Sequence, residues 1–263
     1  MYQRPDSYGP EVASAFEEAS VVQAYRYRPS YPDEVFDWLD GLIVDQPRHV
    51  LDVGCGTGFL ARSLVERVDR LDALDRSEAM IEEGRGLPGG QHPRLRWLIG
   101  DAEHAALQPP YALIVAGDCL HWFEWSVVMP RFASLLTPRG FLASLTVGHL
   151  PPPWQDELRQ LISRFSTNKN YREINIYALL EEYGLFQQAG VYRTTPIPCM
   201  QSIEDYIESF HGRASFSRER MTQEDAAAFD AELCALVEPY SRDGQLQFAV
   251  QAEIVWGKPL KGR

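Results

Sequence analysis

Three glycines at alternate positions, Gly54, Gly56 and Gly58, are the residues of this chain best suited to approach a ligand closely. They directly follow a short apolar run, residues 49–53, which is typical of a buried strand. Glycine lets the backbone turn sharply and removes the Cβ that would keep a ligand away. A dinucleotide-binding turn would need its third glycine at position 59, which is Phe59, and an ATP-binding loop would need a lysine after the last glycine. The turn therefore favours neither a dinucleotide site nor an ATP site. On its own it also fits a tight connection between a strand and a helix that binds no ligand.

Acidic side chains follow the next two apolar runs. Asp75 comes directly after residues 71–74, where its two carboxylate oxygens could accept from both hydroxyls of a ribose or could cap the following helix. Asp101 and Glu103 follow residues 95–99, where a carboxylate could accept from the amino group of adenine. The carboxyl ends of parallel strands meet at one edge of a sheet, so three loops would surround one nucleoside.

The elements that must position these loops are read from apolar runs and chain breakers. Strands are expected at 49–53, 71–74, 95–99, 111–116, 141–147, 191–197 and 246–256, the last as an edge strand, and a Pro–Gly turn is expected at 137–140. Helical spacing follows the glycine turn, and Ser77 is expected to cap a second helix. Strands that alternate with helices predict an α/β Rossmann-like fold, a mostly parallel seven-stranded sheet with helices on both faces.

The alternation ends at three consecutive prolines, residues 151–153. Helical stretches are expected beyond them at about 155–166, 174–183 and 202–238, and we interpret them as a helical cap over the ligand crevice. The chain is expected to form a single domain, with an N-terminal helical segment at 1–45, a core at 46–150, and the cap with the final antiparallel strands at 151–263.

Five segments together resemble the class I S-adenosylmethionine-dependent methyltransferases. LDVGCGTG, ALDRSEAMI and GDAE, at 51–58, 73–81 and 100–103, carry the family resemblance, and YRPSYPDEVFDWL at 27–39 with LHWF at 120–123 extends it to the small-molecule branch that includes trans-aconitate methyltransferase. The resemblance covers about residues 16–147. It departs from the family at the fourth strand, where Tyr111 is followed by Ala112 instead of the usual Asp.

The resemblance implies S-adenosylmethionine as the cofactor. The three glycines would lie against its methionine portion, and Asp75 would bind the ribose. Arg28 would pair with the methionine carboxylate, or it could instead belong to a surface turn. The full set expected at the cofactor is Tyr25, Arg28, Asp52, Gly54, Cys55, Gly56, Gly58, Asp75, Arg76, Met80, Asp101, Ala102, Glu103, Gly117 and Asp118.

Tyr31, His121 and Trp122 are the residues expected at the methyl acceptor. His121 follows the fourth expected strand and could deprotonate a hydroxyl or ammonium group or orient the acceptor, which makes it the candidate catalytic residue. Aromatic faces such as Trp122 attract a sulfonium or ammonium cation. Both residues could instead simply pack in this loop.

Composition narrows the classes of partner. The 263 residues carry a formal charge of −12 with no basic cluster, which disfavours nucleic acid. Because the chain has no long apolar run, we expect neither export nor a membrane span, and we expect the protein in the cytoplasm. We expect a monomer or a homodimer. Four widely spaced cysteines suggest reduced thiols, and no metal site is expected.

The sequence therefore predicts a methyltransferase of a small organic molecule, by O- or N-methylation, with a carboxylate acceptor included. A carbon methyltransferase of a quinone or sterol-like lipid is one alternative. A non-catalytic nucleoside-binding or partner-binding module is the other.

Overall fold

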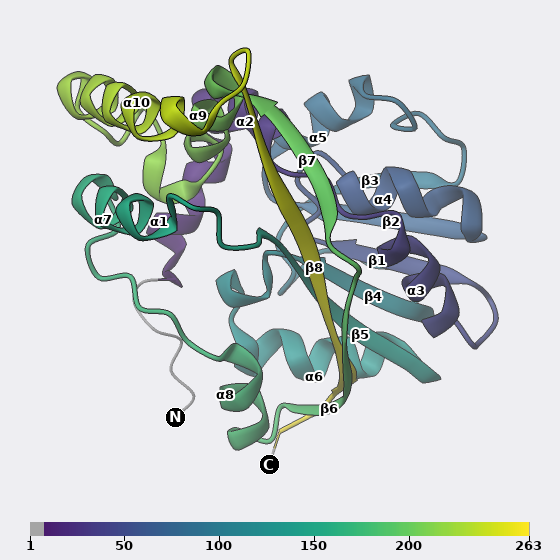
Figure 1. Cartoon of the computed structure of the whole chain (residues 1–263). Helices are drawn as coiled ribbons and strands as arrows, with labels where there is room; N and C mark the ends of the chain where they lie inside the picture. Colours follow the sequence, from purple (N-terminus) through teal and green to yellow (C-terminus); the bar gives the residue numbers. More distant parts are fainter. Residues whose placement is uncertain (1–7, 263) are drawn as a thin grey trace.

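The computed structural model describes residues 8–262, so the first seven residues of the expected N-terminal helical segment and the last residue of the chain lie outside the described part. One mixed sheet forms its centre (Figure 1). Its order is β3 (Leu95–Ile99), β2 (Arg70–Asp75), β1 (His49–Val53), β4 (Tyr111–Gly117), β5 (Leu136–His149), β8 (Gln245–Pro259) and β6 (Phe186–Arg193), with β7 (Ile197–Ser202) also paired to β8. The first five strands along the chain run parallel, and β8 is antiparallel to β5, β6 and β7. The Rossmann-like class is confirmed, with eight strands in place of seven.

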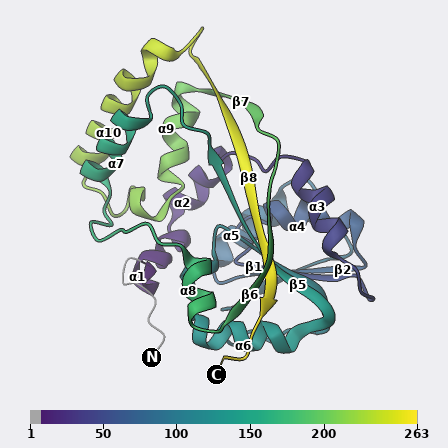
Figure 2. The ribbon, with the colours of Figure 1, turned by 60° about the horizontal axis from the view of Figure 1, so that its bottom comes forward.

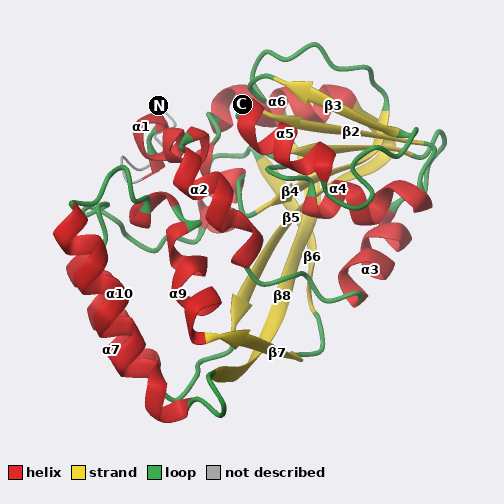
Figure 3. Cartoon of the chain, turned by 90° about the horizontal axis from the view of Figure 1, so that it is seen from above, coloured by secondary structure: helices red, strands yellow, loops and turns green. Residues whose placement is uncertain are grey.

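Helices connect the strands and cover the sheet (Figure 3). They are α1 (Pro10–Ala13), α2 (Ala19–Ala24), α3 (Glu34–Leu42), α4 (Phe59–Leu64), α5 (Glu78–Gly86), α6 (Trp125–Leu135), α7 (Gln155–Phe165), α8 (Ile176–Glu182), α9 (Ile203–His211) and α10 (Gln223–Val237). Short 3-10 turns occur at η2 (Ser14–Glu17), η3 (Tyr25–Tyr27), η4 (Val65–Arg67), η5 (Leu120–Trp122), η6 (Ala214–Phe216) and η7 (Glu238–Tyr240).

Two apolar cores form on the two faces of the sheet. On one face Leu39 of α3 and Leu64 of α4 pack on alternate residues of the central strands. On the other face Trp125 and Phe132 of α6, with Leu180 of α8, pack on the residues in between. Successive strand residues point to opposite faces, so both faces of this parallel sheet are buried, as the continuous apolar runs predict.

Polar side chains begin several helices. Ser77 accepts a hydrogen bond from the backbone N–H of Met80, as expected, and starts α5. Asn175, Ser202 and Thr222 cap α8, α9 and α10 in the same way. Each cap satisfies one of the N–H groups that a helix start leaves unpaired, and so fixes where the helix begins.

The last strand is not an edge strand, which corrects the expectation for 246–256. β8 has β5 on one side, and β6 and β7 follow each other along its other side. Its alternating burial matches the sequence pattern, but that pattern reports which side chains face a core and not how many neighbouring strands pair with the backbone.

Two further boundaries differ from the expected ones. The strand expected at 191–197 spans the end of β6 and the start of β7, which are separate strands. The turn expected at 137–140 lies inside β5, as a register irregularity between the pairs Tyr111–Leu136 and Leu113–Phe141. An irregularity of this kind bends the strand locally without ending it.

The helices after residue 150 serve two purposes (Figure 2). α7, α9 and α10 form a separate apolar cluster with the first half of β8, including Trp154, Tyr206, Phe229 and Phe248. α8, which the sequence also places in the cap, packs on β6 and contributes Leu180 to the core around α6. Within residues 8–262, no helix combines the length and the apolar character that crossing a membrane requires.

A buried hydrogen bond at the departure from the family pattern provides a test of this fold. The Tyr111 hydroxyl donates to Asp72 at 2.6 Å, and both residues are fully buried. We expect Tyr111→Phe to lower the free energy of unfolding by about 1–2 kcal/mol, because it leaves a carboxylate oxygen of Asp72 without its donor. Urea denaturation would measure the change. Tyr240→Phe removes a hydroxyl from a surface tyrosine and serves as the control; equal effects of the two variants would contradict this role.

Candidate functional site

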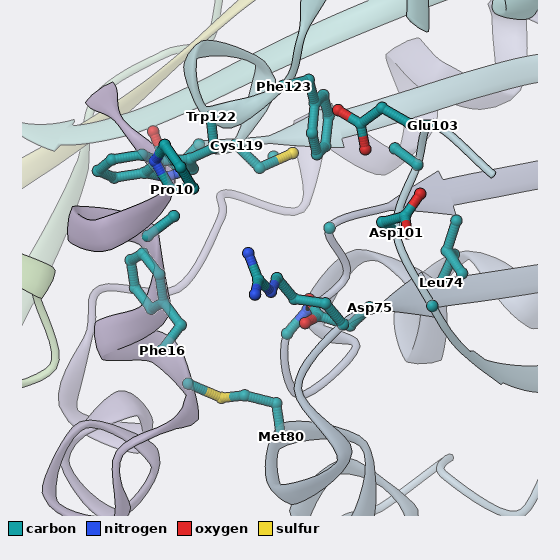
Figure 4. A pocket seen from close by; sticks show the side chains of 18 of the residues that line it. Pro10, Phe16, Leu74, Asp75, Met80, Asp101, Glu103, Cys119, Trp122 and Phe123 are labelled. Carbon is teal, nitrogen blue, oxygen red and sulfur yellow. Dashed lines mark hydrogen bonds between the residues drawn. The ribbon is translucent and has the colours of Figure 1, made fainter. Parts of the chain in front are cut away.

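A cavity of about 850 Å³, part of it open to solvent, lies at the carboxyl ends of β1, β2, β3 and β4 (Figure 4). Its walls combine apolar and aromatic side chains with several carboxylates, the mixture typical of small-molecule sites. We name it the cofactor cavity. It is lined by Pro10, Ala13, Phe16, Tyr25, Arg28, Gly54, Gly56, Leu74, Asp75, Arg76, Met80, Gly100, Asp101, Ala102, Glu103, Gly117, Asp118, Cys119, Trp122 and Phe123.

The glycine turn forms the floor of this cavity. Gly54 and Gly56 have φ of 66° and 54°, a left-handed conformation that residues with a side chain rarely adopt. A Cβ on Gly54 would lie 2.9 Å from the Cys119 side chain, and one on Gly56 would lie 3.2 Å from the Tyr25 hydroxyl. The two glycines therefore keep open the space between the turn and its neighbours.

Asp75 links the turn to the next strand end. One of its carboxylate oxygens accepts from the N–H of Gly56 at 2.7 Å, and the other accepts from the N–H of Ser77 at 2.9 Å. Burial raises the pKa of Asp75 above its ordinary value, and these backbone donors oppose the shift. A carboxylate has about four acceptor positions, so Asp75 retains capacity for hydroxyl groups of a ligand in the cavity.

Three of the expected cofactor residues, at the end of β1 and within the glycine turn, do not line the cavity. Asp52 accepts from the N–H of Ala61 at 3.1 Å, and burial raises its pKa to about 7. Cys55 is buried and donates its N–H to Leu74. Gly58 precedes α4 with φ of 72°, and a Cβ there would lie 2.3 Å from the Trp97 ring. They hold the turn in shape, and direct contact with a cofactor stays a prediction for them.

The far end of the cavity is built after β3. Asp101 and Glu103 line it beside the buried Ala102, as the sequence predicts. Asp101 accepts from the backbone N–H of His104 at 2.7 Å, and Glu103 accepts from the N–H of Glu124 at 2.9 Å. Figure 4 shows both carboxylates on the side of the cavity that Leu74 also borders.

The N-terminal segment closes the opposite side. Pro10 and Phe16 come from this segment and lie across the cavity from Asp75 and Asp101 (Figure 4). Phe16 belongs to a small cluster with Met80, and its neighbour Glu17 pairs with Arg76 at 2.7 Å. The segment is thus fixed to the edge of the sheet on which the cavity opens.

Arg28 and Asp118 form an ion pair at 3.3 Å deep in the site. Asp118, at the end of β4, has φ of 50°, an uncommon conformation for a residue with a side chain, and its N–H donates to Leu145 at 2.8 Å. Burial raises the pKa of Asp118, and Arg28 opposes that shift. Arg28 is therefore not a surface residue; it lies at the boundary between the cofactor cavity and a second one.

The second cavity adjoins the first and extends under the cap. Its volume, including space open to solvent, is about 2490 Å³, and it shares Phe16, Arg28, Asp118 and Trp122 with the cofactor cavity. Further lining comes from the end of β5 and from α7, α8 and the segment around η6. We name it the acceptor cavity.

His121 and Trp122 line the acceptor cavity, as the sequence predicts. The ring of Tyr8 packs edge-on against both, with centroids 5.0 Å from His121 and 5.7 Å from Trp122. Burial, assisted by the positive charge of Arg28, lowers the pKa of His121 to about 4. The imidazole is therefore neutral at physiological pH.

Tyr31 lines neither cavity. Its ring packs against Phe59 with centroids 5.8 Å apart, and its hydroxyl lies 2.8 Å from where a Cβ of Gly117 would be. Its position is behind Gly117, which does line the cofactor cavity. Direct contact of Tyr31 with an acceptor stays a prediction.

Several lining residues have no counterpart among the expected ones. Phe16 and Phe123 border the cofactor cavity, and Tyr8, His149 and Arg213 border the acceptor cavity. Phe123 follows the aromatic pair at 121 and 122, which is a local signal. The others carry none, because only the folded chain brings residues 8, 149 and 213 together.

No group of three or more His, Cys, Asp or Glu side chains within the described residues could hold a metal ion. The residues of the cofactor cavity do fit an adenosine-bearing cation. Glycines open its floor, the Asp75 carboxylate lines it, and acidic groups outnumber Arg28 and Arg76 along its walls.

Comparisons with known proteins agree with this geometry. Residues 50–140 match the family described as a methyltransferase domain. An uncharacterized methyltransferase of Mycobacterium bovis is 34% identical over 148 residues, covering 55% of this chain and 58% of that protein. Trans-aconitate 2-methyltransferase of Pseudomonas paraeruginosa is 32% identical over 125 residues, covering 46% and 42%. The chain thus spans about half the length of these curated relatives.

A solved structure extends the likeness to most of the chain. A protein from Anaeromyxobacter dehalogenans, assigned as a type II methyltransferase, superposes with a TM-score of 0.62 at 21% identity, covering 88% of this chain and 97% of that one. At this identity the likeness shows the fold. Together the comparisons confirm the resemblance to methyltransferases over the core of the chain and to the class I fold over most of its length.

Asp75 is the residue whose role in binding is most directly testable. We expect Asp75→Ala to weaken binding of S-adenosylhomocysteine by roughly 1.5–3 kcal/mol, about 10- to 150-fold, because a charged hydrogen-bond acceptor is lost and the Gly56 N–H loses its partner. Turnover of the saturated enzyme should hardly change. Calorimetry gives the affinity, and Asp156→Ala on the exposed face of α7 is the control. Normal affinity with a collapsed saturated rate would contradict a binding role.

Proposed function

We propose that the chain is an S-adenosylmethionine-dependent methyltransferase that acts on a small organic molecule held in the acceptor cavity. The observation that carries the proposal is the junction of the two cavities. Phe16, Arg28, Asp118 and Trp122 line both, so a ligand in one cavity can meet a ligand in the other at these four residues.

The walls of the junction suit methyl transfer. S-adenosylmethionine supplies an electrophilic methyl group on a sulfonium, and its displacement requires the accepting atom to be close and in line. Phe16 and Trp122 contribute aromatic rings to the junction, and aromatic faces favour a positive charge. Asp118 adds a carboxylate that Arg28 holds in place at 3.3 Å. Positioning by these groups can supply much of the rate enhancement.

His121 is the proposed catalytic residue. Because its pKa is lowered to about 4, it is unprotonated over the neutral range and can accept a proton or a hydrogen bond from an acceptor hydroxyl or ammonium. A carboxylate acceptor would need no base, and His121 would then orient it. Both O- and N-methylation remain within the proposal.

The lining favours a polar acceptor over a quinone or sterol-like lipid. Arg28, Asp118, His121, His149 and Arg213 all border the acceptor cavity. A lipid would leave the His149 Nε2 and the Arg213 guanidinium without hydrogen bonds, at a cost of about 1–3 kcal/mol for each. The relative named for trans-aconitate supports an acid among the acceptors to be tested.

Both cavities are lined by one chain, so we propose a monomer or homodimer whose acceptor site needs no partner subunit. All four cysteines are unpaired, and Cys55 and Cys119 are buried. Free thiols are typical of a reducing compartment, which supports the cytoplasm as the location we propose.

A labelled-methyl assay tests the proposed function. The protein is incubated with S-adenosylmethionine carrying a labelled methyl group and a fractionated metabolite extract, and mass spectrometry identifies the product. We expect label in a small organic molecule, and none with Gly56→Arg, whose side chain would fill the cofactor cavity. Tight cofactor binding without transfer to any fraction would instead favour a non-catalytic nucleoside-binding module.

The pH dependence of turnover tests His121. As the catalytic base, it should give the pH–rate profile an acid limb near pH 4, because protonation below that value removes its lone pair. We expect His121→Ala to remove this limb and to lower kcat by roughly 10²-fold, the lower end for a general base. His92→Ala, outside both cavities, should change neither. An unchanged rate and profile in His121→Ala would leave the residue with a packing role alone.

A further inference from the structure

The cap end of the acceptor cavity contains a guanidinium group without an acidic partner. Arg213 lies between α9 and η6, and its guanidinium carbon is 4.2 Å from the centroid of the Phe210 ring. The aromatic face and the backbone hydrogen bond from its N–H to the Phe210 carbonyl, at 3.0 Å, restrict where the side chain can point. Across residues 8–262 its side chain forms neither an ion pair nor a hydrogen bond.

The other charges around this cavity are compensated or peripheral. Arg28 is paired with Asp118 at 3.3 Å. Glu253 is paired with Arg193 at 2.6 Å, and Glu173 is exposed at the rim. The cavity therefore carries one positive charge without an ion-pair partner among the described residues, that of the partly buried Arg213. Burial and repulsion by Arg28 lower the pKa of Arg213 to about 10, although Tyr206 and Asp118 oppose the shift, so the group is still charged at physiological pH.

A second polar group without a partner lies nearby. His149 ends β5 and lines the same cavity, with its ring against Phe248, at a centroid distance of 4.3 Å. Its Nε2 is buried and has no hydrogen-bond partner among the described residues. Burial, and the positive charge of Arg213 beside it, lower the pKa of His149 to about 4, so the ring offers hydrogen bonding without a second charge.

A partly buried cation without an ion-pair partner is costly, and an anionic ligand would reduce that cost. We propose that Arg213 and His149 form an anion subsite of the acceptor cavity and that the methyl acceptor carries a carboxylate which this subsite recognises. That the bound anion belongs to the methyl acceptor rests on the proposed function. The subsite itself does not depend on catalysis.

The chemistry of the subsite favours a carboxylate over a phosphate ester. One guanidinium group can donate two parallel hydrogen bonds to the two oxygens of a carboxylate, and its single positive charge balances the single negative charge of the carboxylate. A phosphate dianion would need a second cation, and Arg28 is already neutralised by Asp118. Arg213 lines the acceptor cavity and not the cofactor cavity, so its role is to select the substrate.

Acetate is small enough to probe such a subsite without knowledge of the natural acceptor. In the protein saturated with S-adenosylhomocysteine, the NMR signal of the Arg213 side-chain Nε–H is followed while acetate, acetamide or inorganic phosphate is added. We expect a saturable shift with acetate at millimolar concentrations, and none with the neutral acetamide. No saturable shift with acetate overturns the proposal, and stronger binding of phosphate than of acetate overturns the choice of carboxylate.

Variants assign the effect to Arg213. The remaining side-chain signals of the cavity should lose their acetate response in Arg213→Gln, by more than about tenfold in affinity, and recover part of it in Arg213→Lys, which keeps the charge but not the fork. Arg159→Gln on the exposed face of α7 is the matched control. Retained binding of S-adenosylhomocysteine shows that each variant is folded, and an unchanged acetate response in folded Arg213→Gln overturns the assignment.

The activity assay separates this proposal from the proposed function. With the extract divided by ion exchange, we expect labelled product only from the anionic fraction, and a KM at least tenfold higher in Arg213→Gln with a smaller change in kcat. Transfer only to acceptors without a carboxylate would refute the claim that the subsite recognises the acceptor, while confirming methyl transfer. Absence of transfer from every fraction, with the acetate response intact, would refute the proposed function and leave the subsite standing.

Discussion

The hydrogen bond between the Gly56 N–H and the Asp75 carboxylate, 2.7 Å long, joins the ends of the first two strands, and the cofactor cavity depends on it. Gly56 can offer its N–H there because it adopts a left-handed conformation. The second oxygen of Asp75 holds Ser77, and Ser77 in turn caps α5 at the N–H of Met80. One carboxylate therefore sets the turn, the start of the next helix and the position of a side chain on the cavity wall.

β8 imposes a second constraint, because it belongs to the core and to the cap at once. Leu246 and Phe248 in its first half pack in the cap cluster, whereas Ala252 and Ile254 pack in the core beside β1 and β4. A rigid strand thus connects the helices that cover the acceptor cavity with the sheet that holds the cofactor cavity.

The sequence predicts the first half of the chain better than the second, for a physical reason. Apolar runs and glycine turns are local, and they placed β1 and β3 at the observed residues. The N-terminal segment is instead held by contacts some two hundred positions away, such as the ion pair of Glu18 with Arg220 at 2.7 Å. No periodicity encodes such contacts. The same holds for the neighbours of β8 and for the presence of His149 and Arg213 in one cavity. The fifteen expected cofactor residues instead followed from motifs, and twelve of them line the cofactor cavity.

The distribution of charge gives the two cavities different preferences. With a net charge of −12, the protein as a whole repels anions, so a carboxylate acceptor requires a local cation to hold it. Asp75, Asp101 and Glu103 make the cofactor cavity acidic, which suits a sulfonium and an ammonium group, whereas the cap end of the acceptor cavity is positive.

The position of Arg213 within this arrangement separates recognition from reaction. The reacting atom has to lie at the junction, whose lining includes Arg28, Asp118 and Trp122, and Arg213 is absent from that lining. Methyl transfer to a carboxylate neutralises it, so an anion held by Arg213 as the reacting group would lose its attraction on conversion to the ester. An acceptor whose anion is bound beneath the cap while another atom reaches the junction keeps that attraction throughout the transfer. The fold thus favours an acceptor long enough to extend from the cap to the junction, with its anchoring carboxylate at one end and the methylated atom at the other.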